Sequence, residues 1–125
     1  MLRLAEFILK NYSGKVIEVG IGNYTKLAEF LAENGLRVVA TDVVERNVKV
    51  DFFVDDIQKP NLKIYEGAEL IYSLRPPPEI FNAIISVARK VGADCIIKPL
   101  YGDYPNGKLI NHRGLSFYMW RCEDD

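Results

Sequence analysis

The feature that most constrains the fold is a strand, a glycine turn, a helix and a second strand that follow one another directly. Residues Lys15 to Val19 (KVIEV) are mostly β-branched and apolar, which is typical of a buried strand. Apolar residues at helical spacing follow at 27–31, Asn34-Gly35 supplies a helix stop, and Arg37 to Thr41 form the next strand. Such a unit of about thirty residues has parallel strands joined by a right-handed crossover. The sequence therefore predicts an α/β protein whose sheet is at least partly parallel.

The remaining elements extend this unit into a Rossmann-like fold. We expect a leading helix over residues 2–12, further strands at Val50 to Val54, Glu69 to Leu74 and Asp94 to Lys98, a helix over Glu79 to Val91, and a hairpin around His112-Arg113-Gly114. Only eight residues, Val43 to Val50, separate Asp42 from Asp51, whereas a parallel crossover usually needs about a dozen or more, so either the connecting helix is reduced to one turn or the third strand is a short edge. The expected fold is a three-layer sandwich of one domain, residues 1–125, with a mostly parallel sheet, a C-terminal antiparallel hairpin and a reduced set of helices.

Composition and charge exclude several classes of protein. The 125 residues are 49% hydrophobic and 26% charged with a net charge of −1, and the cations are scattered, so the footprint of a nucleic-acid binder is absent. No apolar stretch approaches the ~20 residues of a membrane span and the start has no cleavage pattern, which predicts a cytoplasmic protein. Cys95 and Cys122 lie in apolar runs without metal spacing, so we expect reduced, buried cysteines, and the single histidine, His112, leaves no multi-histidine metal site. Residues 101–108 (YGDYPNGK) form either a lid or a simple loop.

The glycine turn is the first candidate for chemistry. Gly20 and Gly22, in EVGIGNYTKL, lie between a strand and a helix, where free backbone N–H groups suit an anion and glycine lets a ligand approach the main chain. The dinucleotide fingerprint would need a third glycine at position 25, where this chain has Thr25, so an NAD site is incomplete. Asp42 follows about twenty residues later at the end of the second strand, where an exposed carboxylate accepts ribose hydroxyls. This pattern favours an adenosine-type ligand, although glycines needed only for the turn remain the alternative.

An acidic residue, any residue, then glycine-x-glycine at the end of the first strand resembles the first motif of class I S-adenosylmethionine-dependent methyltransferases. Glu18, Gly20 and Gly22 match it here. The resemblance implies that Glu18 and the glycine turn, with Asn23 and with Tyr24 where many members have a third glycine, hold the methionine end of S-adenosylmethionine. It also implies that Asp42 holds the ribose.

The resemblance continues at VDDI and over the whole chain. It places Asp55 or Asp56 near the adenine amino group and lets Ile57 pack on the adenine ring, although both aspartates are equally compatible with solvated turn residues. The chain also resembles a small archaeal family of unknown function that has a trimmed methyltransferase-like core, on the strength of EVGIGNY, TDV and YSLRPP. That family brings no established activity.

A second group of residues follows the fourth strand, in SLRPPP. Methyltransferases that modify amino groups often have an acid or amide, two prolines and an aromatic residue here, whereas this chain has Ser73, Leu74 and Arg75 before Pro76. A guanidinium repels an ammonium and grips a carboxylate or phosphate with two parallel hydrogen bonds, so an acceptor substrate bound here is predicted to be anionic. The alternative is that the prolines and Glu79 simply begin a helix.

Three functions remain open at the level of sequence. The first is an S-adenosylmethionine-binding protein with possible methyl transfer to an unknown acceptor. The second is a degenerate, non-catalytic domain that acts as a regulatory or structural subunit. The third, an NAD-binding domain, is disfavoured by Thr25. In each case the missing helices leave apolar sheet faces bare, so we expect a homodimer or a partner protein that covers them.

Overall fold

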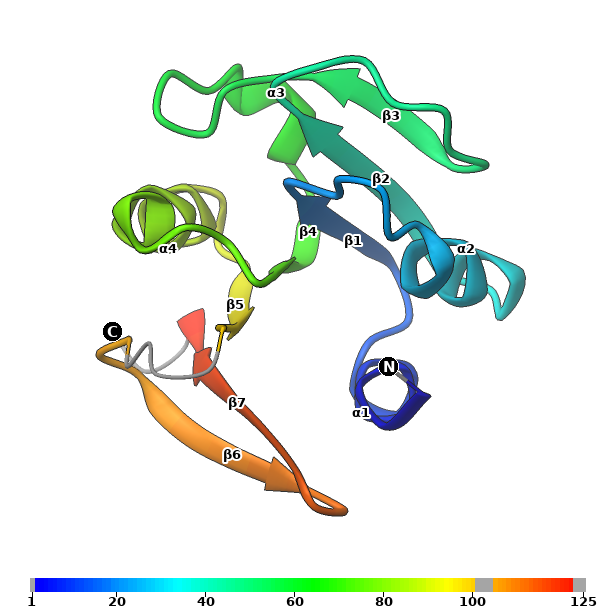
Figure 1. The fold of residues 1–125 in the computed structure, drawn as a ribbon, viewed down its shortest axis with the longest axis vertical. Coiled ribbons are helices and arrows are strands. Elements are labelled where there is room, and N and C mark those ends of the chain that lie inside the picture. Colours follow the sequence, from blue (N-terminus) through cyan, green and yellow to red (C-terminus); the bar gives the residue numbers. More distant parts are fainter. Residues whose placement is uncertain (1, 101–104, 123–125) are drawn as a thin grey trace.

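The computed structural model describes residues 2–100 and 105–122, which form one seven-stranded sheet with helices on both faces (Figure 1). The strands lie in the order β3-β2-β1-β4-β5-β7-β6. The helices are α1 (Leu2–Asn11), α2 (Lys26–Glu33), α3 (Leu62–Tyr65) and α4 (Phe81–Val91), and the strands are β1 (Lys15–Val19), β2 (Arg37–Asp42), β3 (Asp51–Val54), β4 (Ala68–Leu74), β5 (Asp94–Lys98), β6 (Lys108–His112) and β7 (Leu115–Trp120). Strands β1 to β5 are parallel, and β7 runs antiparallel to both β5 and β6. The predicted α/β fold class is confirmed.

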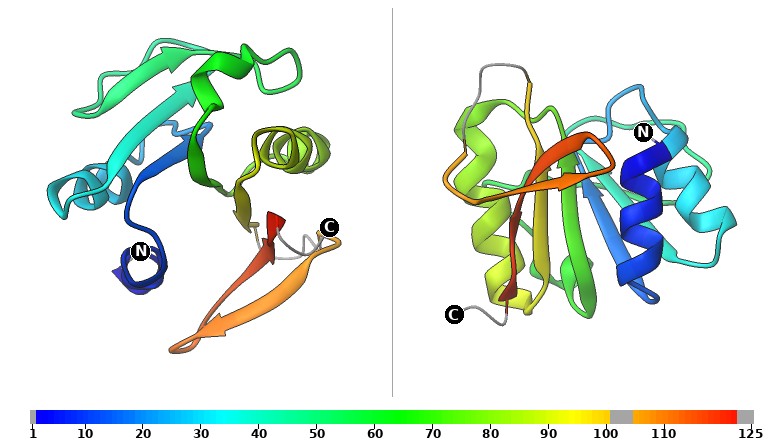
Figure 2. Two further views of the ribbon diagram at one scale, coloured as in Figure 1. Left: turned by 180° about the vertical axis from the view of Figure 1, so that it is seen from behind. Right: turned by 90° about the horizontal axis from the view of Figure 1, so that it is seen from below.

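The sheet separates two apolar clusters, and Figure 2 shows it between α4 and the pair α1 and α2. Because successive strand residues point to opposite faces, Val16 enters the cluster below α1 and α2, and Ile17 enters the cluster below α3 and α4. Both side chains are fully buried, which contributes roughly 1.5–3 kcal/mol each. The same alternation turns Glu18 toward the α1 and α2 side, where Tyr72 from β4 also lies.

The order of the strands predicts a ligand-binding crevice at the carboxyl ends of the parallel strands, which we call the carboxyl edge of the sheet. Strand β1 pairs with β2 on one side and with β4 on the other. The strands that follow β1 in the chain therefore lie first on one side of it, as β2 and β3, and then on the other side, as β4 and β5. Ligands of open α/β sheets bind outside the carboxyl ends of the strands at such a switch point. The predicted site residues lie in the last residues of β1, β2 and β4 or directly after β1, β3 and β4, at this edge.

The connection between β2 and β3 resolves the alternative that the sequence left open. Residues 43–50 contain no helix, and β3 is a four-residue edge strand, so the second of the two predictions is correct. The short helix α3, between β3 and β4, was not predicted. It has only one turn, and the Asn61 side chain caps its start by accepting a hydrogen bond from the Lys63 N–H. Such a turn is too short to show helical periodicity.

The C-terminal hairpin is confirmed. His112 pairs with Leu115, so Arg113 and Gly114 alone form the turn, and both have positive φ angles, 53° and 86°. A turn with two left-handed residues matches the twist of the strands that it joins.

Three further expectations have different outcomes. Cys95 is buried, as expected, and burial raises the pKa of its thiol, but the expectation that Cys122 is buried is wrong because it is only half-buried. The predicted loop or lid at 101–108 lies partly outside the described residues. Within residues 2–100 and 105–122, no helix has the length and apolar character that crossing a membrane requires.

Candidate functional site

The glycine turn has a conformation that depends on glycine. Gly20 and Gly22 have φ angles of 68° and 59°, which side chains with a Cβ rarely adopt. The N–H groups of Gly20 and Ile21 both donate to the Thr41 carbonyl, at 2.9 and 3.1 Å, and thereby fasten the turn to the end of β2. A Cβ added at Gly20 would meet nothing within 4 Å, so this glycine borders open space rather than packed protein. The turn therefore has room for a ligand beside its main chain.

Glu18 lies beneath this turn as a buried acid. Its exposed fraction is 1%, and the Tyr72 hydroxyl donates to its Oε1 over 2.8 Å. Its Oε2 is buried without a hydrogen-bond partner among the described residues. Burial raises the pKa of the Glu18 carboxyl to about 8, although the Tyr72 hydrogen bond lowers it. The side chain is therefore mostly protonated at neutral pH, and one oxygen atom can still take a partner.

Asp42 is more enclosed than the sequence suggested. Its Oδ2 accepts from the Gly22 N–H at 2.8 Å and from Arg46 Nε at 3.0 Å, and its Oδ1 accepts from the Val43 N–H at 2.7 Å. Only 8% of the residue is exposed, so the expectation of an exposed carboxylate is wrong. The carboxylate holds the glycine turn in place, which is a structural role beside the predicted ribose-binding one.

Arg46 is a site residue that the sequence did not reveal. Besides Asp42, its guanidinium donates from Nη1 to the Asn23 side-chain oxygen at 3.1 Å, so it bridges the end of β2 and the glycine turn. In a helix, an opposite charge four residues after Asp42 would predict an ion pair. Residues 43–50 have no helix, so the spacing alone does not predict that Arg46 contacts Asp42. Arg46 uses part of the hydrogen-bonding capacity of the Asp42 carboxylate.

The residues after β3 are held by contacts of their own. The Asp55 carboxylate accepts from the Tyr65 hydroxyl at 2.7 Å and from the Asn61 N–H at 3.0 Å. Asp56 is exposed and accepts from the Gln58 N–H at 2.9 Å, which is the geometry of a local turn. Ile57 is buried in the cluster below α3 and α4. Asp55 and Asp56 thus lie at the predicted edge but already have protein partners.

The end of β4 is hydrogen-bonded to the end of β1. The Ser73 hydroxyl donates to the Val19 carbonyl at 2.7 Å, where β1 and β4 cease to pair. Arg75 has a φ of 53°, which is strained for a residue with a side chain, and its N–H donates to the Lys98 carbonyl at 2.6 Å. Pro76 is buried. Strained backbone of this kind is concentrated at functional sites.

A cavity of about 110 Å³ joins the two groups of predicted residues. Ile21 and Tyr24 line it from the glycine turn, and Leu74 and Arg75 line it from the end of β4. It is smaller than the about 300 Å³ at which small-molecule pockets usually begin, so a nucleoside would lie mainly on the open edge beside it. The described residues contain no group of three or more metal-ligating side chains.

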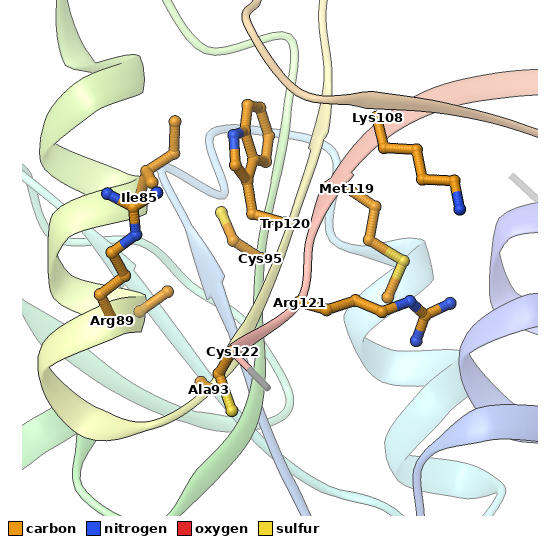
Figure 3. A pocket seen from close by; sticks show the side chains of 10 residues that line it. Ile85, Arg89, Ala93, Cys95, Lys108, Met119, Trp120, Arg121 and Cys122 are labelled. Atoms are coloured by element: carbon orange, nitrogen blue, oxygen red, sulfur yellow. The ribbon is translucent and has the colours of Figure 1, made fainter. Parts of the chain in front are cut away.

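A second cavity, of about 220 Å³, lies between α4 and the strands β5 and β7. Figure 3 shows Ile85 and Arg89 of α4 on one side, and Cys95 and Trp120 on the strands opposite them. None of the predicted site residues lines it. The carboxyl edge therefore remains the candidate site.

The sequence of this chain matches the uncharacterised protein family UPF0146 over residues 1–122. The chain belongs to this family. A UPF0146 protein of Archaeoglobus fulgidus is 61% identical over 126 residues, which cover 99% of this chain and 97% of the relative. A UPF0146 protein of Pyrococcus furiosus is 45% identical over 130 residues, which cover 96% and 98% of the two chains. The predicted membership of a small archaeal family is confirmed.

Methyltransferases are among the solved structures that have the same fold as this UPF0146 chain. The antibiotic-resistance methyltransferase Kmr has a TM-score of 0.60 at 13% identity, with 94% of this chain and 91% of Kmr covered. Magnesium protoporphyrin IX methyltransferase (ChlM) of Synechocystis with bound S-adenosylmethionine has a TM-score of 0.57 at 14% identity, with 94% and 76% covered. At such low identity the likeness shows the fold alone, which is the predicted methyltransferase-like core.

Proposed function

We propose that this UPF0146 protein binds S-adenosylmethionine at the carboxyl edge, between the ends of β1, β2 and β4, and transfers its methyl group to an anionic acceptor. The observation that carries the proposal is the unpartnered Oε2 of Glu18, which is buried near the end of β1, two residues before Gly20, where an added Cβ would meet open space. A buried polar atom without a partner is rare in native proteins, and a ligand group that completes its hydrogen bonds would account for it.

The residues of this edge suit the parts of such a cofactor. Glu18 would hold the cationic methionine end, and Asp42 would hold the ribose once Arg46 moves aside. Near the adenine, the Asp55 oxygens keep lone pairs beyond those used by Tyr65 and Asn61, Asp56 keeps an exposed oxygen, and Ile57 would contact the ring. The cofactor supplies an activated methyl group, and the protein contributes mainly the positioning of the two reactants.

The acceptor end is Arg75. Arg75 is exposed and lines the cavity that Tyr24 and Leu74 also line, and Lys98, the last residue of β5, pairs with Leu74 beside it. Two cations at one strand edge favour a carboxylate or phosphate acceptor over an amine. Ser73 and Pro76 are buried and would shape this end of the site from below.

The test is a titration followed by amide chemical shifts, with S-adenosylmethionine, S-adenosylhomocysteine and NAD added separately. We expect shifts confined to residues 20–24 and Asp42 with the first two ligands and none with NAD. Glu18→Gln should weaken binding because it cannot become an anion, whereas Glu33→Gln, an exposed change on α2, should leave binding unchanged. No shift with any ligand at millimolar concentration would exclude the proposal.

The second candidate is a non-catalytic regulatory or structural subunit, and two observations favour it. The Asp42 carboxylate accepts a hydrogen bond from Arg46, and the Asp55 carboxylate accepts one from Tyr65. The two acids that would hold the nucleoside therefore already have protein partners. Under this hypothesis the same titration gives no response, and Asp42→Asn lowers the free energy of unfolding without affecting any ligand.

A further inference from the structure

Strand β3 is a free edge with hydrogen-bonding groups that point away from the sheet. It pairs with β2 only, and the Asp55 N–H that follows it donates inward to the Asp42 carbonyl at 2.9 Å. Because the direction of the backbone groups alternates along a strand, the N–H and C=O groups of Phe52 and Val54 point outward. Among the described residues, no hydrogen bond uses them. Such a row is a template for another strand.

Apolar side chains gather around the same edge. Five of the ten large apolar side chains that are exposed among the described residues belong to this region, namely Val43, Val44, Phe53, Val54 and Leu62. The sheet lacks a covering helix here because β2 and β3 are joined by a loop. Phe53 and Val54 are successive residues of β3, so exposed apolar side chains lie on both faces of the sheet beside its open edge. Exposed apolar side chains at an unpaired edge strand favour an interface.

The other free edge, β6, is protected. It begins with Lys108, and the hairpin that contains it is tied to α1 by the ion pair of Arg113 with Glu6 at 2.8 Å. A lysine on an edge strand and a neighbouring helix both hinder the addition of another strand. Strand β3 has neither.

The sequence of the β3 edge is complementary to itself. When Phe52 lies opposite Phe52 of an antiparallel second copy, Val54 lies opposite Val50, and each such pair can exchange both backbone hydrogen bonds. Val50, Phe52 and Val54 share one face, on which Val50 and Phe52 already pack against the cluster below α1 and α2. On the other face, the same register brings Lys49 opposite Asp55 of the second copy, at two symmetric positions.

The neighbouring register fits less well. When Phe53 lies opposite Phe53 of the second copy, Asp51 lies opposite Asp55, which sets two carboxylates against each other. We infer that UPF0146 chains form a two-fold symmetric dimer by antiparallel pairing of their β3 strands about Phe52, which joins two sheets into one. This inference does not depend on the proposed cofactor.

The experiment measures mass by light scattering during size exclusion, at about 100 µM protein, which exceeds the micromolar Kd of many small interfaces. The wild type should have twice the mass of one chain. Val54→Lys should give the monomer, because the 52%-exposed side chain would oppose Val50 of the second copy with a charge. The matched control is Leu109→Lys, a change of an equally exposed leucine on the other edge, which should stay dimeric.

Two further measurements keep the result independent of misfolding. Circular dichroism should show that Val54→Lys is folded, and Lys49→Asp should weaken the dimer at least fivefold by reversing the charge opposite Asp55. Amide exchange at Phe52 and Val54 should be slow in the wild type and fast in folded Val54→Lys. A monomeric wild type, a dimer that survives Val54→Lys, or a dimer broken only by Leu109→Lys would each overturn the inference.

Discussion

The Tyr72 hydroxyl donates to Oε1 of Glu18 over 2.8 Å, and this is the one hydrogen bond that the buried carboxyl makes among the described residues. Burial raises its pKa in the folded state to about 8 from 4.5. Between these values the folded protein holds a proton that the unfolded chain releases. The free energy of unfolding should therefore fall as the pH rises from 4.5 to 8, by at most about 1.4 kcal/mol per pH unit.

Glu18→Gln should remove this pH dependence, because the amide stays neutral in both states while its oxygen still accepts from Tyr72. We expect the variant to be more stable than the wild type by about 3 kcal/mol at pH 7 and to differ little from it at pH 4. Urea unfolding at both pH values measures the difference. An equal gain at both pH values would show that ionisation of Glu18 is not the cause.

The affinity for S-adenosylmethionine should depend on pH in the opposite sense. A cationic ligand needs the ionised form of Glu18, and below a pKa of about 8 that form increases tenfold with each pH unit. We expect the affinity to rise up to tenfold per unit from pH 6 and to level off near pH 8. Calorimetry should also record proton release below pH 8, and Glu18→Gln should bind weakly with no such rise.

Sequence reasoning predicted which candidate residues lie at the carboxyl ends of the strands, but not the burial and the hydrogen bonds of their side chains. Gly20 and Gly22 were predictable because a turn between a strand and a helix that needs positive φ angles selects glycine. The burial of Asp42 was not predictable, since it results from Arg46 and from the N–H groups of Gly22 and Val43, which the irregular loops bring to it. Contacts between loops have no periodicity that a sequence can display.

The fold divides in the same way. Strand β1 was predicted to the residue from its β-branched, apolar content, and helices α2 and α4 were predicted nearly to the residue from their apolar spacing and stop signals. The four-residue β3 was predicted to within one residue, at Val50 to Val54, whereas the one-turn helix α3 is too short for a period and was not predicted. Tyr65 of α3 donates to Asp55, which follows β3. Strands and long helices are therefore visible in the sequence, and a single helical turn held by one side-chain contact is not.

Arg46→Ala should raise the affinity for S-adenosylmethionine. The guanidinium shares Oδ2 of Asp42 with the Gly22 N–H, so a ribose hydroxyl must displace it before it can bind there. The ion pair is partly exposed, and its loss corresponds to about fivefold in affinity, or roughly 1 kcal/mol. The control is Lys10→Ala, which removes an exposed cation of α1 that, among the described residues, makes no hydrogen bond with Asp42. Weaker binding by Arg46→Ala would mean that Arg46 contacts the ligand instead.

Arg75→Gly should separate stability from function at the acceptor end. Arg75 has a φ of 53°, and a left-handed residue with a Cβ costs about 1–2 kcal/mol, of which glycine returns part after its larger loss of backbone entropy. We expect the variant to gain about 0.5–1 kcal/mol in the free energy of unfolding. Inorganic phosphate should produce amide shifts at Tyr24 and Leu74, which line the same cavity, and losing the guanidinium should abolish them.

Arg113→Gly is the matched control for this prediction. Arg113 has the same φ of 53°, in the hairpin turn, and its ion pair with Glu6 is exposed and contributes little. It should gain a similar stability in urea unfolding, yet it should keep the phosphate-induced shifts at Tyr24 and Leu74 unchanged. If both variants lose these shifts, or neither does, Arg75 is not the anion-binding residue. The positive φ of Arg75 would then be explained only by the 2.6 Å hydrogen bond that its N–H donates to the Lys98 carbonyl.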